Sequence, residues 1–265
     1  YEAARALAAA GHPVVLVCRS QERGEAAMDR IRAETPAADL DLVVCDLEDF
    51  DAVGQAAPQL AERAPRPLAL VNNAGVYRAR LERTPAGFER TMAVNHLGPY
   101  LLTRLLEPTL RESGARVVQV ASAAHRSGKL QRSPLRQILR EPSSYRGFGA
   151  YADSKLANVL FTRELARRWP EVTALAVHPG MLSTAIWDRN RTVGMALVRL
   201  IKPFMGDPAD GGRAVAEVAT HPRFGAHAGA YVNRTTVEPA RLPDGADTLA
   251  RELWEVSAEA LGLDS

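Results

Sequence analysis

Short apolar runs alternate with longer segments of helical periodicity along the chain. The apolar runs have strand length and occupy residues 14–18, 40–45, 68–71, 116–121, 172–177 and 228–232. Apolar positions spaced for one helix face fill residues 1–10, 21–34, 51–63, 85–110, 150–168, 208–220 and 244–261. Strands that are apolar throughout are typical of a sheet covered on both faces, and their alternation with helices predicts right-handed βαβ units. We therefore expect an α/β fold, a doubly wound parallel sheet with helices on both faces, in a single domain of residues 1–265.

Two segments interrupt this alternation. Residues 123–149 are polar and basic with little periodicity, and residues 185–204 are amphipathic but do not lie between two strands. Long insertions in compact α/β domains tend to be lids or site-forming loops. Ligands of such sheets bind at the carboxyl ends of the strands, where both insertions should emerge.

The composition of the chain limits the kinds of partner that we expect it to bind. The net charge of the 265-residue chain is only +2 and its basic residues are spread along the chain, so we expect no nucleic-acid partner. No apolar run approaches the roughly 20 residues that span a bilayer, so we expect no membrane span. Cys18 and Cys45 end apolar runs and are predicted to be buried free thiols of a cytoplasmic protein. A small-molecule substrate is the expected partner, and a second copy of the chain is left open.

Tyr151 and Lys155 are the first candidate chemical pair. Four residues apart on a predicted helix, their side chains share one face. A phenol with a pKa of about 10 is a poor base at neutral pH, and a neighbouring cation favours its phenolate form. The pair is therefore suited to exchanging a proton with an alcohol oxygen, although surface pairs of this spacing are common.

Polar residues at strand ends extend this site. Ser122 directly follows an apolar strand, so its hydroxyl either bonds a substrate oxygen or belongs to a turn. The segment 72–75 also follows a strand, and its small residues either let a planar ligand approach or form an ordinary turn. Asn95 lies in an apolar helical stretch, where an amide is either a structural bridge or part of a proton relay.

The motifs occur together in a known order. They are Asn72-Asn73-Ala74-Gly75, Val94-Asn95-His96-Leu97-Gly98, Val120-Ala121-Ser122-Ala123-Ala124-His125, Tyr151-Ala152-Asp153-Ser154-Lys155-Leu156-Ala157-Asn158 and His178-Pro179-Gly180. With these motifs the chain resembles the short-chain dehydrogenase/reductase family, and within it the retinol-dehydrogenase-like branch. The resemblance covers essentially the whole chain.

The resemblance implies a role for each catalytic candidate. Tyr151 would be the general acid or base, and Ser122 would polarise the substrate carbonyl. Lys155 would hold the nicotinamide ribose and lower the pKa of the phenol. Asn95 would anchor a water-mediated proton relay. The implied reaction is hydride transfer between a nicotinamide cofactor and an alcohol/carbonyl pair, and an apolar lid at 185–204 would favour a hydrophobic substrate.

The resemblance also implies a cofactor site. Besides Tyr151 and Lys155, it would comprise Asn73, Ala74 and Gly75 along the cofactor, Asp46 and Leu47 at the adenine, and Pro179, Gly180 and Thr184 beside the nicotinamide. Enzymes that prefer NAD place a carboxylate after the strand that corresponds to residues 14–18, where it binds the ribose 2′-hydroxyl. The 2′-phosphate of NADP instead requires a cation at that position. Here Arg19 follows residues 14–18 and no acidic residue does, so we expect NADP as the cofactor. NAD is the alternative cofactor, and an ordinary surface role is the alternative for Arg19.

One part of the family pattern is absent. The glycine-rich phosphate turn should precede the helix at residues 1–10, but no glycine occurs before Gly11. We expect the native protein to carry roughly 15 further residues there, enough for a central strand and its turn, and to bind dinucleotide poorly without them. Without that strand, two sheet edges would be unpaired.

Three alternatives follow from these observations. A non-catalytic scaffold or regulatory protein would keep the fold, but it has no need for Ser122, Tyr151 and Lys155 together. A sugar-nucleotide epimerase or dehydratase uses the same Tyr and Lys, but those enzymes usually carry a larger carboxyl-terminal domain than this chain has after Gly180. A metal site is not expected, because His96, His125 and His178 lack ligand spacing.

Overall fold

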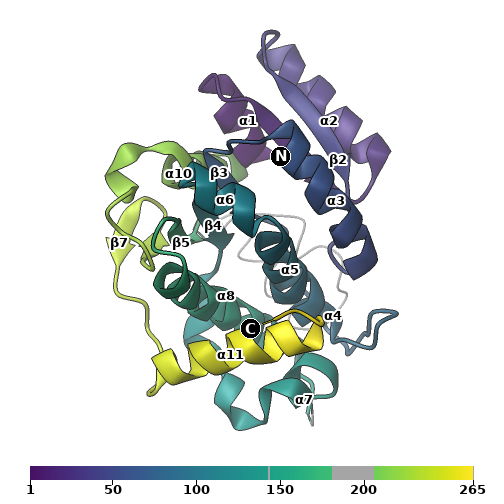
Figure 1. Cartoon of the computed structure of the whole chain (residues 1–265), viewed down its shortest axis with the longest axis vertical. Helices are drawn as coiled ribbons and strands as arrows, with labels where there is room; N and C mark the ends of the chain where they lie inside the picture. The colour runs from purple at the N-terminus through teal and green to yellow at the C-terminus, as the bar shows by residue number, and fades with distance from the viewer. Residues whose placement is uncertain (143, 181–205, 265) are drawn as a thin grey trace.

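The computed structural model describes residues 1–142, 144–180 and 206–264 (Figure 1). Its strands are β1 (Val14–Cys18), β2 (Leu40–Val44), β3 (Ala69–Asn72), β4 (Arg116–Val120), β5 (Thr173–His178), β6 (Tyr231–Asn233) and β7 (Thr236–Glu238). The strands β3 to β6 pair in parallel in chain order, and β7 adds an antiparallel hairpin strand to β6. The expected doubly wound parallel sheet is therefore confirmed, with β7 as a strand that the sequence pattern did not predict.

The sheet is discontinuous between β1 and β3. Strands β1 and β2 form a separate parallel pair, and β3 begins the five-stranded sheet. Figure 1 shows β2 with α1 and α2 at the top of the molecule, apart from β3, β4 and β5. Among the described residues no strand joins the two sheets, so the facing edges of β1 and β3 have no ladder partner.

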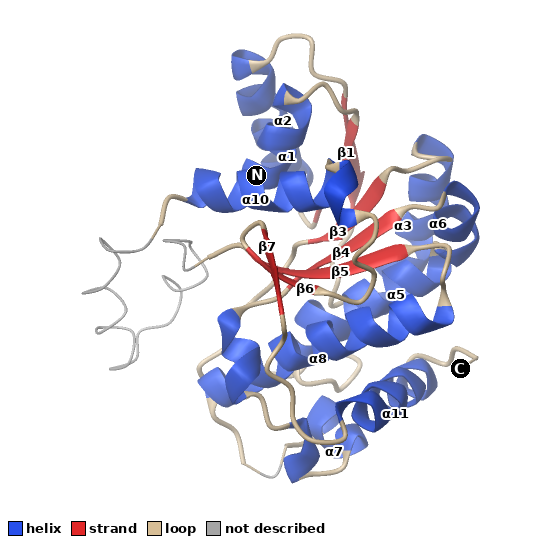
Figure 2. Cartoon of the chain, turned by 90° about the vertical axis from the view of Figure 1, so that its left-hand side faces the viewer, coloured by secondary structure: helices blue, strands red, loops and turns tan. Residues whose placement is uncertain are grey.

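Helices cover both faces of the sheet. The longer ones are α1 (Glu2–Ala9), α2 (Gln21–Glu34), α3 (Phe50–Arg63), α5 (Gly98–Leu105), α6 (Glu107–Ser113), α7 (Leu135–Arg140), α8 (Gly147–Arg168), α10 (Pro208–Thr220) and α11 (Ala246–Ala260), and a single turn forms α4 (Arg90–Met92). In Figure 2, α10 lies on one face of the five-stranded sheet and α5 and α8 on the other. Helix α11 packs on the outer side of α8. None of the helices in the described ranges is long and apolar enough to cross a membrane.

Helix α8 is buried because it lies between the sheet and α11. A helix of a globular protein usually has one apolar stripe, and one that is covered on several sides is apolar around most of its surface. Leu156, Leu160 and Leu165 of α8 are all fully buried. This burial also removes Tyr151 and Lys155 from water, leaving 7% and 3% of their surfaces exposed.

The segment predicted as one helix over 85–110 is divided into shorter pieces. Helix α4 begins at Arg90, where the Glu89 carboxylate accepts hydrogen bonds from the backbone of Thr91 and Met92 at 2.9 and 2.7 Å. A π-helix follows at Ala93–Leu97 and precedes α5. Pro99 has no N–H to donate to the Asn95 carbonyl, which removes the α-helical bond at this point and accommodates the π turn.

The insertion at 123–149 is attached to α8 through Asp153. It contains 3₁₀ turns at Ala123–Ser127 and Leu130–Arg132, followed by α7. The buried Asp153 carboxylate accepts a 2.6 Å hydrogen bond from the Lys129 backbone and forms a 2.6 Å ion pair with Arg132. The other expected insertion, at 185–204, lies outside the described residues.

Candidate active site

The site forms where β4 ends and α8 begins its buried course. Ser122 follows β4 and caps the next 3₁₀ turn, with its Oγ accepting a 3.2 Å hydrogen bond from the Ala124 backbone. Burial raises the pKa of Tyr151, and a hydrogen bond with the Ser122 side chain lowers it to a smaller extent. Ser122 therefore caps a turn, as one alternative expected, and its side chain also bonds the phenol of Tyr151, whereas its contact with a substrate oxygen remains a prediction.

Lys155 lies one helical turn from Tyr151 on α8. Its Nζ donates a 2.7 Å hydrogen bond to the Val120 carbonyl and lies 5.7 Å from the centre of the Tyr151 ring. Burial lowers the pKa of Lys155 to about 8. An ammonium group has three donors, and Val120 supplies one hydrogen-bond acceptor, so the group retains donors for hydroxyl groups of a ligand such as a ribose.

Asn95 is fully buried in the π-helix and bridges two segments. Its Oδ1 accepts a 2.7 Å bond from the Val76 backbone, and its Nδ2 donates to the Val76 carbonyl at 3.0 Å and to Ser154 Oγ at 2.9 Å. Ser154 in turn donates to the Tyr151 carbonyl at 2.7 Å. The structural bridge expected for Asn95 is therefore present, and the proton relay remains a prediction.

The segment 72–75 passes close to these groups. Asn72 is buried and donates a 3.0 Å hydrogen bond to Thr103, which fixes the end of β3. Asn73 and Ala74 are exposed, as a surface that meets a ligand must be. A Cβ atom at Gly75 would lie 3.4 Å from Lys155 Nζ and 3.6 Å from Asn95 Oδ1, so the small residue permits the close approach.

The residues expected at the far end of a cofactor belong to the first sheet and its neighbourhood. Arg19 follows β1, is exposed, and forms no ion pair with any residue that the structure describes. Asp46 Oδ1 accepts a 3.2 Å bond from the Glu48 backbone, and the Leu47 carbonyl packs against Gly98.

The residues expected beside the nicotinamide follow β5. Pro179 and Gly180 are partly buried, and Gly180 has a φ of 104° that favours glycine. Thr184 lies outside the described residues.

Three neighbours of the site were assigned no role in it from sequence, although Asn158 and His125 belong to the family motifs. Asn158 donates a 3.3 Å bond to the carbonyl of Val120 that also accepts from Lys155. The Tyr77 ring meets the Tyr151 ring edge-on at 6.2 Å, and His125 Nδ1 lies 2.7 Å from the Ser122 carbonyl. The helical spacing of Asn158 from Lys155 was the one available signal, whereas Tyr77 and His125 depend on loop geometry.

Sequence comparison identifies a family. The model of the short chain dehydrogenase family matches residues 1–134. Retinol dehydrogenase 12 of Homo sapiens is 38% identical over 99% of this chain and 82% of its own length. Dehydrogenase/reductase SDR family member 13 of Homo sapiens is 37% identical over 97% of this chain and 68% of its own length.

Solved structures agree with this assignment. A putative uncharacterized protein from Mycobacterium paratuberculosis superposes with a TM-score of 0.74 at 28% identity, covering 99% of this chain and 88% of its own. A blue fluorescent protein from a metagenomic library, solved in complex with NADPH, gives a TM-score of 0.66 at 26% identity over 90% of this chain and 92% of its own. With the catalytic motifs gathered at one site, the chain belongs to the short-chain dehydrogenase family of oxidoreductases, in the branch that resembles the retinol dehydrogenases.

Proposed function

We propose that this protein transfers a hydride between NADP(H) and an alcohol/carbonyl substrate, with Asn95, Ser122, Tyr151 and Lys155 as its catalytic set. The observation that carries the proposal is the meeting of Ser122, Tyr151 and Lys155 at the end of β4, with the phenol and ammonium buried. A scaffold protein would not require these three groups together.

In the direction of reduction, the substrate carbonyl oxygen accepts hydrogen bonds from the Tyr151 and Ser122 hydroxyls. The bound cofactor supplies the hydride to the carbonyl carbon. Tyr151 gives its proton to the oxygen, so the carbonyl becomes an alcohol and the phenol becomes a phenolate. The cation of Lys155 stabilises that phenolate, because a charge in a water-poor site acts more strongly than in bulk water. Oxidation runs through the same steps in reverse.

Proton supply to the phenolate is the role we assign to the Asn95 region. Asn95 is tied through Ser154 to the carbonyl of Tyr151 and through Val76 to the segment beside Lys155. This arrangement holds the amide near the ammonium, where a water molecule between them would relay protons. Asn95 thereby positions the relay rather than giving up a proton itself.

The remaining donors of Lys155 support binding of the nicotinamide ribose, and the exposed Asn73 and Ala74 with Gly75 support a cofactor surface beside it. Pro179, Gly180 and Thr184 complete the nicotinamide end in this proposal, and Asp46 and Leu47 the adenine end. Arg19, exposed and without an ion pair in the described chain, supports NADP over NAD because a guanidinium suits the 2′-phosphate.

The substrate is proposed to have a largely hydrophobic body. Support comes from relatives that are named retinol dehydrogenases and from the apolar residues of the segment 185–204. A cytoplasmic location is also proposed, since Cys18 and Cys45 are free thiols. Burial raises the pKa of the Cys45 thiol to about 11, which keeps it protonated and unreactive.

Reduction of a panel of hydrophobic aldehydes with NADPH and with NADH tests this function. We expect turnover with NADPH at a lower KM than with NADH. Arg19→Gln should narrow that difference and leave kcat with NADH unchanged, since NADH has no 2′-phosphate. The cofactor preference would be wrong if Arg19→Gln affected both cofactors equally, and the function would be wrong if no aldehyde or alcohol were converted with either.

A further inference from the structure

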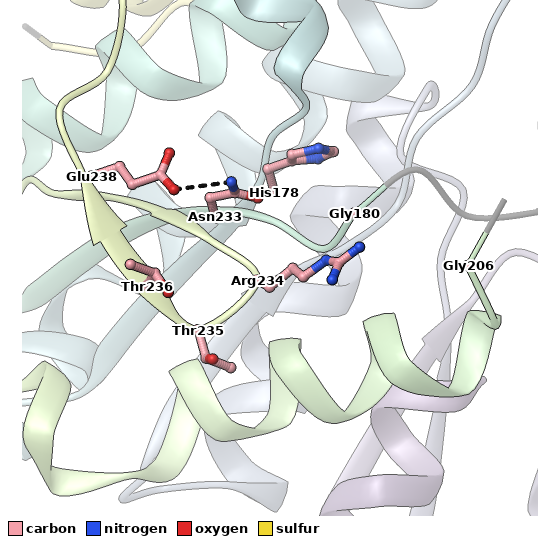
Figure 3. A pocket seen from close by; sticks show the side chains of 8 residues that line it. All are labelled: His178, Gly180, Gly206, Asn233, Arg234, Thr235, Thr236 and Glu238. Carbon is pink, nitrogen blue, oxygen red and sulfur yellow. Dashed lines mark hydrogen bonds between the residues drawn. The ribbon is translucent and has the colours of Figure 1, made fainter.

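A polar pocket lies beside the catalytic residues, at the carboxyl end of β5 and the tip of the β6–β7 hairpin. Its volume is about 470 Å³, and among the described residues it is lined by His178, Gly180, Gly206, Asn233, Arg234, Thr235, Thr236 and Glu238 (Figure 3). We call it the hairpin pocket. Its lining is unexpectedly polar for the binding site of a wholly apolar molecule.

Ser122 directly follows β4 and His178 ends β5, so the candidate catalytic site and the hairpin pocket lie at the carboxyl ends of neighbouring strands. The Ala121 backbone donates a 2.8 Å hydrogen bond to the Val177 carbonyl. This bond holds the segment that leads to Ser122 against the strand that ends at His178. The ring of His125, whose Nδ1 lies 2.7 Å from the Ser122 carbonyl oxygen, packs against the ring of Tyr231 in β6, with ring centres 4.7 Å apart and planes tilted by 54°. A substrate bound at Ser122 therefore has the pocket within its reach along this edge.

Arg234 supplies a positive charge to the hairpin pocket. It occupies the turn between β6 and β7 with a φ of 54°, and in the described ranges it is the one residue other than glycine with a positive φ. Its backbone donates a 2.7 Å bond to the His178 carbonyl, which fixes the turn against β5. Its guanidinium is exposed, and within residues 1–142, 144–180 and 206–264 it forms no ion pair.

The carboxylate of the pocket is engaged elsewhere. Glu238 Oε1 accepts a 3.0 Å hydrogen bond from Asn233 Nδ2. In Figure 3 the Glu238 side chain turns toward Asn233, while Arg234 extends to the other side, toward Gly180. An anion beside Arg234 would thus be separated from the one acid that is described in the lining.

Buried polar atoms at and near the pocket lack partners among the residues that the structure describes. They are His178 Nδ1, His125 Nε2 and the Tyr231 hydroxyl, and of these three residues His178 lines the pocket. Burial lowers the pKa of His178 to about 4, so its ring is neutral at pH 7 and offers a hydrogen bond without a charge.

We propose that the hairpin pocket binds an oxyanion carried by the substrate, with Arg234 as the specificity-determining residue. This inference rests on the proposed function and refines its substrate class. The substrate would be an alcohol or carbonyl compound with an apolar body and a carboxylate or phosphate group at a distance from the reacting carbon.

Matched substrates separate this proposal from general activity. The probes are ω-oxo carboxylic acids of six to twelve carbons, their methyl esters, and ω-oxoalkyl phosphates of the same lengths. Arg234→Gln should raise KM about tenfold for the charged substrates of suitable length and leave the esters unchanged, as expected for a lost charge-assisted bond. Arg241→Gln, an exposed arginine that does not line the pocket, is the matched control and should change none of these values.

The outcomes are distinguishable. A tenfold effect on only the acids or only the phosphates identifies the oxyanion. Equal effects of Arg234→Gln on charged substrates and esters, or no effect on either, would overturn the proposal while leaving hydride transfer intact. Calorimetric titration with ω-hydroxy acids and ω-hydroxy methyl esters makes the same comparison without turnover, so the pocket is tested even if the proposed function fails. Preserved ester binding in Arg234→Gln shows that the variant is folded.

Discussion

Lys155 Nζ donates a 2.7 Å hydrogen bond to the carbonyl of Val120, the last residue of β4. This bond holds the ammonium group of α8 at the end of β4, two residues before Ser122 along the chain. The cation is therefore positioned by main-chain geometry rather than by a carboxylate, which would neutralise its effect on Tyr151. A carbonyl partner leaves the full charge to act on the phenolate.

Lys155 should set the upper pH limit of the reduction reaction. Burial lowers its pKa to about 8, so the ammonium is present below that pH and is lost above it. We expect kcat/KM for aldehyde reduction to fall as the pH rises through about 8, measured between pH 6 and 10. Lys155→Met should reduce kcat/KM at least 100-fold at pH 7 and remove this inflection. An unchanged inflection in Lys155→Met would show that another group controls it.

Asn95→Leu should lower both stability and activity. The variant keeps the side-chain volume but removes the three hydrogen bonds to Val76 and Ser154, leaving buried polar groups unpaired. We expect a loss of about 2–4 kcal/mol in the free energy of unfolding, measured by urea denaturation. Asn158→Leu removes a single 3.3 Å bond and should cost less. Equal losses in the two variants would contradict the bridging role of Asn95.

His96 should make the protein sensitive to acid. It is fully buried, and burial lowers its pKa to about 3 from the ordinary value near 6.5. Below pH 6.5 the unfolded chain therefore takes up a proton that the folded protein refuses, and stability is lost as the pH falls toward 3. This residue alone should cost about 2 kcal/mol between pH 7 and pH 5.

His96→Gln provides the check on that prediction. Thermal or urea unfolding at pH 7 and pH 5 should show a smaller loss on acidification in the variant than in the native protein. The remaining loss is expected from His125 and His178, whose pKa values burial also lowers. A pH dependence that is the same in both proteins would exclude His96 as a source.

Gly98 and Gly54 offer a matched pair of substitutions to alanine. A Cβ atom at Gly98 would lie 2.3 Å from the Leu47 carbonyl oxygen, a backbone atom that can move only with its loop. Gly98→Ala should therefore destabilise the fold by about 1–3 kcal/mol through overpacking. Gly54, inside α3, has open space around it, and Gly54→Ala should stabilise by up to about 1 kcal/mol. Denaturation midpoints of the two variants should move in opposite directions, and a shared direction would contradict this account.

Hydrophobic periodicity predicted the elements of the fold where neighbouring positions in the sequence repeat the same pattern. Helix α10 has the predicted bounds of 208–220, and β1 those of 14–18. Strand β7 has only three residues, of which Thr236 and Val237 are exposed, so it carries no apolar pattern. The π turn at Asn95 arises from the missing N–H of Pro99 and from tertiary bonds to Val76, which periodicity does not contain.

The candidate site was predictable to the extent that strand ends carry polar residues. Ser122 and Lys155 were expected together from their motifs. In the structure Lys155 bonds the carbonyl of Val120, two residues before Ser122. Asn158 and His125 belong to the family motifs, but no role in the site was predicted for them because each contacts a backbone carbonyl, at Val120 and Ser122. Which side chain meets a backbone carbonyl depends on loop geometry, and the residue type alone does not predict it.

Tyr151→Phe tests the central claim most directly, because it removes one hydroxyl and keeps the buried ring beside Tyr77. The measurement is kcat for aldehyde reduction with NADPH, together with NADPH binding followed by fluorescence. We expect kcat to fall at least 100-fold while the affinity for NADPH stays within about twofold, since a general acid contributes 10²–10⁴ to the rate. Turnover of Tyr151→Phe close to that of the native protein would contradict the proposed mechanism.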